Sequence, residues 1–416
     1  MIDTARVLPS LKSRQDYFDY LDGYSVEANE QLAERHTATG LVKSYMLETV
    51  REGDPTPTLQ AIFSASGVGL EQVDAGLYTV SDRKLGGKVG LLEVVNSRHP
   101  VLYTLLNTDQ SQPWINRIVQ TTPWLDHLWL SAPIFQELWR YVQDTADPHR
   151  FTRMSFEYTA YYESEDSDRS GQITTDSEPD DDEASADGSS EDRRSPERRA
   201  SRFTMVDRVR TIGVKLPTLS NTYHPLYSIT QLRVPAAGRG GHDFYFDGRV
   251  TNRGDSFADH RLNVQFVIDA YRRITERAES DLWVTSEEST LGDSGFNLRG
   301  AAVYMKFSEP LDSTTFDRWI TATFARKRNR FRLSGHPFRL GPTKVHVYGL
   351  DRHLWQPLLL EITNKQLVAV LPRGTCGNTI HRLVTNVQRM VDPAVETWVG
   401  DQPYGELVQE ALHARS

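Results

Sequence analysis

His260-Arg261-Leu262-Asn263-Val264-Gln265 is a stretch that this chain uses twice. The second copy reads His381-Arg382-Leu383 and, after two further residues, Asn386-Val387-Gln388. An Arg-Gly pair precedes each copy, at Arg253-Gly254 and at Arg373-Gly374. Both copies lie where predicted strands give way to an amphipathic helix, so the chain is predicted to carry one α/β unit twice.

Each predicted unit has the order strand, helix, four strands, helix. Both units begin with a strand that runs into a Ser-x-Pro helix start, at Ser131-Ala132-Pro133 and at Ser308-Glu309-Pro310. Proline is tolerated in a first helical turn because the N–H that it lacks has no intrahelical partner there. This order resembles the fold of TATA-binding protein and other saddle or helix-grip domains. The resemblance implies antiparallel sheets, each closed by a helix, and it implies no ligand.

The region before the first unit is predicted to be helical and then winged-helix-like. Helices are expected at 41–51, around 58–66 and at 70–82, followed by a pair of β-rich runs within 89–105. Three short helices followed by a hairpin resemble a winged helix-turn-helix domain, and this resemblance implies contact with DNA or docking of a protein. We therefore predict an α+β fold. The predicted domains are a helical arm at 1–36, a winged-helix-like domain at 37–126, two repeats at 127–282 and 283–395, and a C-terminal tail at 396–416.

One segment carries the whole net charge of −9. Residues 163–200 contain 14 acidic residues and 5 arginines, and the rest of the chain is formally neutral. The segment has too few apolar residues to offset its ordering entropy, so we predict a disordered acidic insertion within the first repeat, and a contact for a protein partner. The neutral remainder predicts no general electrostatic attraction to nucleic acid.

The cysteine count and the absence of long apolar runs indicate the compartment. Cys376 is the single cysteine, which excludes an internal disulfide and a Cys-based zinc site. No signal peptide and no run long enough to span a bilayer are recognised, so we expect a cytoplasmic protein without a membrane partner. The 38 arginines against 9 lysines indicate a GC-rich genome, and together with the surplus of acidic residues they suit a haloarchaeal protein.

Two groups of basic residues are predicted to contact the phosphates of nucleic acid. The first lies in the winged-helix-like domain, and the second lies within residues 326–332. The alternative for the second group is a solvated helix end whose cations complement the helix dipole, with the acidic insertion as its partner. For the first group the alternative is a protein-docking module, because acidic residues outnumber basic ones in that domain. The predicted contacts are Lys84, Lys88 and Arg98 in the first group and Arg326, Lys327, Arg328, Arg330 and Arg332 in the second.

Two further clusters of polar residues each have two interpretations. Asp243, Asp247 and His260 offer carboxylates and an imidazole within a short stretch, which would suit a metal-dependent hydrolase or nuclease, but a turn rich in Gly, Asn and Asp explains them equally well. The repeated His260-Arg261 and His381-Arg382 could hold an anion near helix starts or could join the two repeats. No phosphate-binding loop, Gly-x-Ser-x-Gly elbow or His-Glu-x-x-His motif occurs, and no cofactor is predicted.

The leading hypothesis is a non-enzymatic protein that binds DNA or a DNA-bound partner. The second is the metal-dependent hydrolase or nuclease, and the third is a structural subunit of a larger assembly.

Overall fold

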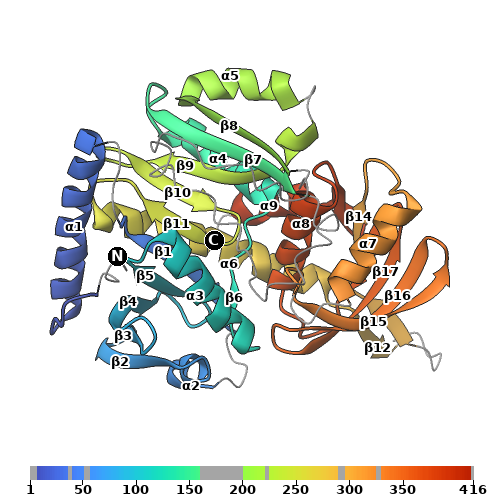
Figure 1. Cartoon of the computed structure of the whole chain (residues 1–416). Coiled ribbons are helices and arrows are strands. Elements are labelled where there is room, and N and C mark those ends of the chain that lie inside the picture. Colours follow the sequence, from blue (N-terminus) through green and yellow to red (C-terminus); the bar gives the residue numbers. More distant parts are fainter. Residues whose placement is uncertain are drawn as a thin grey trace, which may run out of the picture.

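The computed structural model describes residues 7–35, 40–50, 57–159, 200–220, 224–288, 296–324 and 329–413. Within these ranges, helices and antiparallel sheets form an α+β fold, which confirms the predicted class (Figure 1). The described part has one sheet of 11 strands and another of seven. Residues 163–199 of the predicted acidic insertion lie outside the described residues.

The first part of the larger sheet forms a unit of strand, helix, four strands and helix. Its elements are β1 (Lys43–Glu48), α2 (Leu59–Ser64), β2 (Val68–Asp74), β3 (Leu77–Asp82), β4 (Gly87–Val94), β5 (Pro100–Thr104) and α3 (Thr108–Thr121). The four strands from β2 to β5 form a meander, and β5 returns to pair with β1 in antiparallel register, with Tyr45 opposite Leu102.

Two of the three helices predicted for a winged helix are strands. Residues 41–51 contain β1, and residues 70–82 contain most of the β2–β3 hairpin. Every residue of β1 is buried, because this strand lies in the middle of its sheet. A strand that is buried on both faces loses the alternation of apolar and polar residues that would distinguish it from a buried helix. The helix prediction is therefore wrong for these two segments, and the order that a winged helix requires is not found here.

The first predicted repeat continues the larger sheet. Its elements are β6 (Asp126–His127), α4 (Ala132–Thr145), β7 (Phe151–Thr159), β8 (Ala200–Arg208), α5 (Val209–Ser220), the 3-10 helix η4 (His224–Tyr227), β9 (Ile229–Pro235), β10 (Gly241–Tyr245), β11 (Arg249–Asn252) and α6 (Phe257–Leu282). The repeat has one more strand than predicted, since β8 pairs with β7 at the edge of the sheet. Because β11 pairs with β1, the first two units share one sheet.

The second predicted repeat builds the seven-stranded sheet. Its elements are β14 (Val303–Lys306), α7 (Ser313–Phe324), β15 (Leu333–Gly341), β16 (Lys344–Asp351), β17 (Gln356–Thr363), β18 (Gln366–Val370) and α8 (Asn378–Met390), after the small hairpin β12 (Thr285–Glu288) and β13 (Phe296–Arg299). As in the first unit, the last strand pairs with the first, here β18 with β14. Within the described residues, the predicted order thus occurs in the first unit and in the second predicted repeat, and the first predicted repeat has it with an added strand and helix.

The two ends of the chain pack against these units. The predicted N-terminal arm contains α1 (Arg14–Arg35), which packs beside α6. The predicted C-terminal tail instead forms β19 (Glu396–Val399), which pairs with β14, β20 (Gln402–Pro403), and α9 (Tyr404–His413), which packs on α6 and α4.

Helix α8 lies between the two sheets in Figure 1, and all of its residues are buried. The predicted apolar stripe, which includes Ile380, Leu383 and Val387, belongs to the main core. The opposite face carries Arg382, Asn386 and Arg389, which are also buried and need polar partners inside the protein. This polar face forms one wall of the pocket described next.

Candidate functional site

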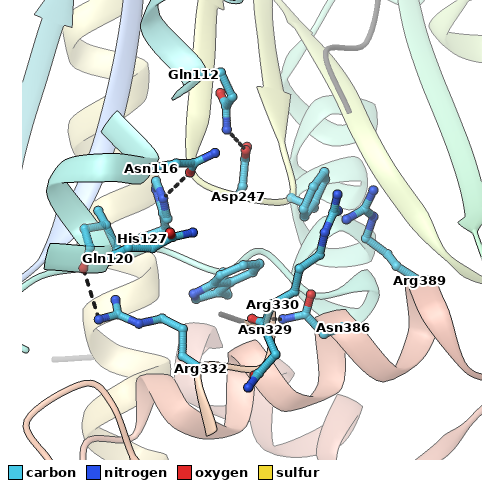
Figure 2. Close-up of a pocket in the computed structure, with 13 residues that line it drawn as sticks. Gln112, Asn116, Gln120, His127, Asp247, Asn329, Arg330, Arg332, Asn386 and Arg389 are labelled. Atoms are coloured by element: carbon cyan, nitrogen blue, oxygen red, sulfur yellow. Dashed lines mark hydrogen bonds between the residues drawn. The ribbon is translucent and has the colours of Figure 1, made fainter. Parts of the chain in front are cut away.

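A pocket of about 120 Å³ lies where the three units meet (Figure 2). Helix α3 of the first unit forms one wall, and α8 of the third unit forms another. The turn between β10 and β11 and the segments around 127–129 and 329–332 complete the lining. The lining residues are Gln112, Asn116, Val119, Gln120, His127, Trp129, Phe246, Asp247, Asn329, Arg330, Arg332, Asn386 and Arg389.

Among the neutral side chains that line the pocket, three have a buried polar atom without a hydrogen-bond partner. Gln112, His127 and Asn386 are only 8%, 5% and 0% exposed. The unpartnered atoms are Oε1 of Gln112, Nδ1 of His127 and Oδ1 of Asn386. An unsatisfied buried polar group typically costs about 1–3 kcal/mol. A ligand that bonds to these atoms would remove that cost.

Other hydrogen bonds hold the same three side chains in place. The amide Nε2 of Gln112 donates to Asp247 Oδ2 at 2.7 Å. The amide Nδ2 of Asn386 donates to the carbonyl oxygen of Arg382 at 2.9 Å. His127 Nε2 lies 3.0 Å from Asn116 Oδ1. The pocket is therefore already arranged before any ligand enters.

Burial sets the protonation state of the histidine in this pocket. It lowers the pKa of His127 below its ordinary value, although the carboxylates of Asp247 and Asp126 oppose this shift. The imidazole is therefore neutral at neutral pH, and only one of its two nitrogens carries a proton.

Aromatic and cationic side chains form the rest of the pocket. The rings of Trp129 and Phe246 lie 6.3 Å apart between centroids. The guanidinium carbon of Arg389 lies 3.4 Å from the centroid of Phe246, and its Nη2 donates to Glu157 at 3.3 Å. Arg330 lines the pocket and is half-buried. The pocket thus combines flat apolar surfaces with cations and amides.

A buried ion-pair cluster beside the pocket fixes the relative positions of its walls. Arg332 and Arg382 both donate to the carboxylate of Asp126, and Arg382 also donates to Asp351. Burial alone would raise the pKa of Asp126, but the two guanidinium groups hold it well below its usual value. The second nitrogen of Arg332 donates to carbonyl oxygens at the end of α3, those of Val119 and Thr122.

The structure separates the predicted phosphate contacts. Arg332, at 7% exposure, belongs to this buried cluster, and Arg98, at 3%, donates to Glu48 and Glu279 in the interior. Neither is available to a phosphate backbone, so the prediction is wrong for these two residues. Lys84 is exposed, and Lys88 pairs with Glu71 at 3.0 Å. Of the remaining residues, Arg330 lines the pocket, and Arg326, Lys327 and Arg328 lie outside the described residues.

The residues of the predicted metal site do not converge. Asp243 is buried between Arg233 and Arg253, and its carboxylate accepts hydrogen bonds from both guanidinium groups. His260 lies 2.6 Å from Ser44 Oγ, and Asp247 faces the pocket. Within the described residues, no group of three or more His, Cys, Asp or Glu side chains could hold a metal ion.

The repeated His-Arg pairs are also internal. His260 and His381 are fully buried, and His381 Nδ1 lies 2.6 Å from the hydroxyl of Tyr404. Burial lowers the pKa of His381 to about 3, so this imidazole is neutral. Arg261 pairs with Glu93, and Arg382 with Asp126 and Asp351. These side chains make contacts inside the folded chain, and the predicted anion site and the predicted contact between the two repeats both stay predictions.

Most of the pocket was not recognised in the sequence, because its residues are spread from Gln112 to Arg389. One signal was present: Asn386 belongs to the Asn-Val-Gln part of the duplicated stretch. Arg330 was singled out as a cation. No local motif marks Gln112 or His127.

These features define an α+β protein with a buried polar pocket at the junction of three units of similar element order. The profile of the MJECL33-like protein family matches residues 7–206 and 219–405, and the chain belongs to this family. Over 167 residues it is 28% identical to Uncharacterized protein MJECL33 of Methanocaldococcus jannaschii, a match that covers 40% of this chain and 38% of that relative's length. No solved structure matches.

The relative is archaeal, which supports the archaeal part of the prediction from composition. None of the described helices has the length and apolar character needed to cross a membrane.

Proposed function

We propose that this chain is a non-enzymatic protein that binds a nucleotide in the pocket between α3 and α8. The nucleotide is either free or part of a single strand of DNA, so the proposal retains the DNA association predicted from the sequence and moves its site. A cytoplasmic location and a haloarchaeal source are part of the same proposal.

The observation that carries the proposal is the set of unpartnered polar atoms on Gln112, His127 and Asn386 beside the aromatic rings of Trp129 and Phe246. Asn and Gln side chains recognise the hydrogen-bonding edges of bases, and aromatic rings provide surfaces for base stacking. Arginine suits phosphate because its planar guanidinium donates in parallel to two oxygens. A nucleotide contains all three matching groups: an edge with hydrogen-bonding atoms, a flat ring and a phosphate.

The other two sequence-based hypotheses have less support. The metal-dependent hydrolase has less support among the described residues, because Asp243 and His260 lie outside the pocket that contains Asp247. A structural subunit stays a prediction. It would depend on the outer face of the seven-stranded sheet, where Phe338 and Tyr348 are 63% and 79% exposed.

Isothermal titration calorimetry with the full chain tests the proposal. The probes are mononucleotides, the matching nucleosides without phosphate, ribose 5-phosphate without a base, and short single-stranded oligonucleotides. We expect a mononucleotide or an oligonucleotide to bind, and removal of either the base or the phosphate to weaken binding at least tenfold. No binding by any mononucleotide or oligonucleotide would overturn the proposal. Comparison of the mononucleotide with the oligonucleotide identifies the source.

A pair of variants tests whether the binding occurs in this pocket. Gln112→Met keeps the shape of the side chain and removes its amide, and Gln110→Met makes the same change on the same helix at a position outside the pocket. We expect the first to weaken binding about tenfold, as for the loss of one hydrogen bond worth about 1.4 kcal/mol. Gln110→Met should bind like the wild type. Equal affinities for all three proteins would exclude the pocket as the site.

A further inference from the structure

We infer that the pocket selects a base rich in hydrogen-bond donors, and guanine in particular. This inference rests on the proposed function and adds the identity of the base. The orientation of each unpartnered polar group carries it.

Gln112 lines the pocket and carries an unpartnered acceptor. Its amide group has one nitrogen that donates and one oxygen that accepts. The neighbour of this amide, Asp247, carries a carboxylate, which only accepts, so the nitrogen of Gln112 has to face it. The unpartnered Oε1 is then a carbonyl oxygen, and its only complement is a donor.

Asn386 presents an acceptor for the same reason. Its Nδ2 donates to two backbone carbonyl oxygens, those of Arg382 at 2.9 Å and Arg330 at 3.3 Å. Carbonyl oxygens do not donate, so the amide cannot be reversed without breaking both bonds. The unpartnered Oδ1 of Asn386 therefore also requires a donor from the ligand.

His127 adds a third acceptor. The neutral ring has one N–H donor and one nitrogen with a free lone pair. Its Nε2 lies 3.0 Å from Asn116 Oδ1, an acceptor, so the proton resides on Nε2 and the unpartnered Nδ1 carries the lone pair. The unpartnered atoms of these three neutral side chains are thus all acceptors, and a ligand that complements them offers several N–H groups.

The bases differ in the hydrogen-bonding groups that they can place against these three acceptors. Guanine carries N–H donors on N1 and on its exocyclic amino group, side by side on one edge. Adenine and cytosine carry donors only on one amino group, with unprotonated ring nitrogens beside it, and uracil and thymine have one ring N–H between two carbonyl groups. Carbonyl groups or unprotonated ring nitrogens that face these acceptors would leave buried polar atoms unpaired, which reduces affinity strongly. Guanine therefore complements these three acceptors best.

The test compares the affinities of four ribonucleotides for the full chain by calorimetry. The probes are GMP, IMP, AMP and UMP, where IMP is GMP without the exocyclic amino group. We expect GMP to bind about tenfold more tightly than IMP and at least tenfold more tightly than AMP or UMP. Equal or tighter binding of AMP or UMP would overturn the choice of guanine and leave the proposed function standing. No binding of any nucleotide, free or in a strand, would remove both.

Two further measurements extend the test: a pair of variants and a competition with an oligonucleotide. Gln112→Met should weaken GMP binding about tenfold and reduce the preference for GMP over UMP, while Gln110→Met should change neither. A short oligothymidylate with one central dG should compete with GMP if the natural source is a DNA strand, and should fail to compete if it is a free nucleotide. An unchanged preference for GMP in Gln112→Met would contradict the role assigned to its oxygen.

Discussion

Arg98 donates to both carboxylate oxygens of Glu279, with its Nη2 2.6 Å from Oε1 and its Nη1 3.3 Å from Oε2. The same guanidinium donates from Nε to Glu48 Oε1 at 2.5 Å. Glu48 belongs to β1 of the first unit and Glu279 to α6 of the second. One buried cation thus bridges two carboxyl groups from two units and holds these units together.

Replacing Arg98 with methionine should destabilise the protein strongly. Arg98→Met leaves the carboxylates of Glu48 and Glu279 buried without their cation, and the loss of one partner from a buried ion pair typically costs about 3–5 kcal/mol. Urea unfolding followed by tryptophan fluorescence measures the change. Lys84→Met is the control, since Lys84 is exposed and its substitution should change stability by less than about 0.5 kcal/mol. Similar small effects of both substitutions would contradict the structural role of Arg98.

The same cluster makes stability depend on pH. Burial raises the pKa of Glu48 from 4.5 to about 7, although the charge of Arg98 opposes this shift. The folded protein therefore binds this proton more tightly than the unfolded chain does. The contribution of Glu48 to stability is fully present below about pH 4.5 and falls as the pH rises toward 7, by up to about 3 kcal/mol.

Glu48→Gln removes this titration. We expect the difference in unfolding free energy between the variant and the wild type to change in favour of the variant from about pH 5 to about pH 8. Glu71→Gln is the control: its carboxylate is exposed and pairs with Lys88, which lowers the pKa of Glu71. The neutral Glu71→Gln should therefore not gain on the wild type over that range. A constant difference between Glu48→Gln and the wild type would disprove the raised pKa.

The fold was predictable where a sequence pattern is typical of only one kind of secondary structure. The apolar stripe of α8, with Ile380, Leu383 and Val387, predicts a helix because its spacing matches the helical period. Strand β1 (Lys43–Glu48) was not recognised, because complete burial removes the alternation that marks a strand. That error hid the first of the three units, whose order of elements matches the two that were predicted.

The site was much less predictable, because burial decides what an ionisable residue does. Arg330 and Arg332 are two positions apart and looked equivalent in the sequence. In the structure, Arg330 lines the pocket at partial exposure, while Arg332 is buried and bonds to Asp126. Gln112 and His127 become neighbours of α8 only through tertiary packing, and no spacing in the sequence indicates such a contact.

The turn between β9 and β10 is tightly packed against the backbone around Arg253. Gly240 has φ 74° in the turn between β9 and β10, and a Cβ there would lie 2.0 Å from the backbone oxygen of Arg253. Gly86 has a similar φ of 82°, but a Cβ there would meet nothing within 4 Å. Gly86→Ala should therefore cost only the left-handed strain, about 1–2 kcal/mol. Gly240→Ala should cost clearly more, and equal thermal midpoints for the two variants would show that the turn relaxes freely.

The N-terminal helix caps a helix that is remote in the sequence. Oδ1 of Asp22 on α1 accepts from the backbone N–H of Phe257 at 2.8 Å and of Ala258 at 3.2 Å, the first residues of α6. Loss of an N-cap acceptor costs about 0.5–2 kcal/mol, so Asp22→Ala should destabilise the protein by about that amount. Asp19→Ala on the same helix removes only an exposed bond to Gln15 and should have a smaller effect. If the two variants unfold at the same urea concentration, α1 packs beside α6 without capping it.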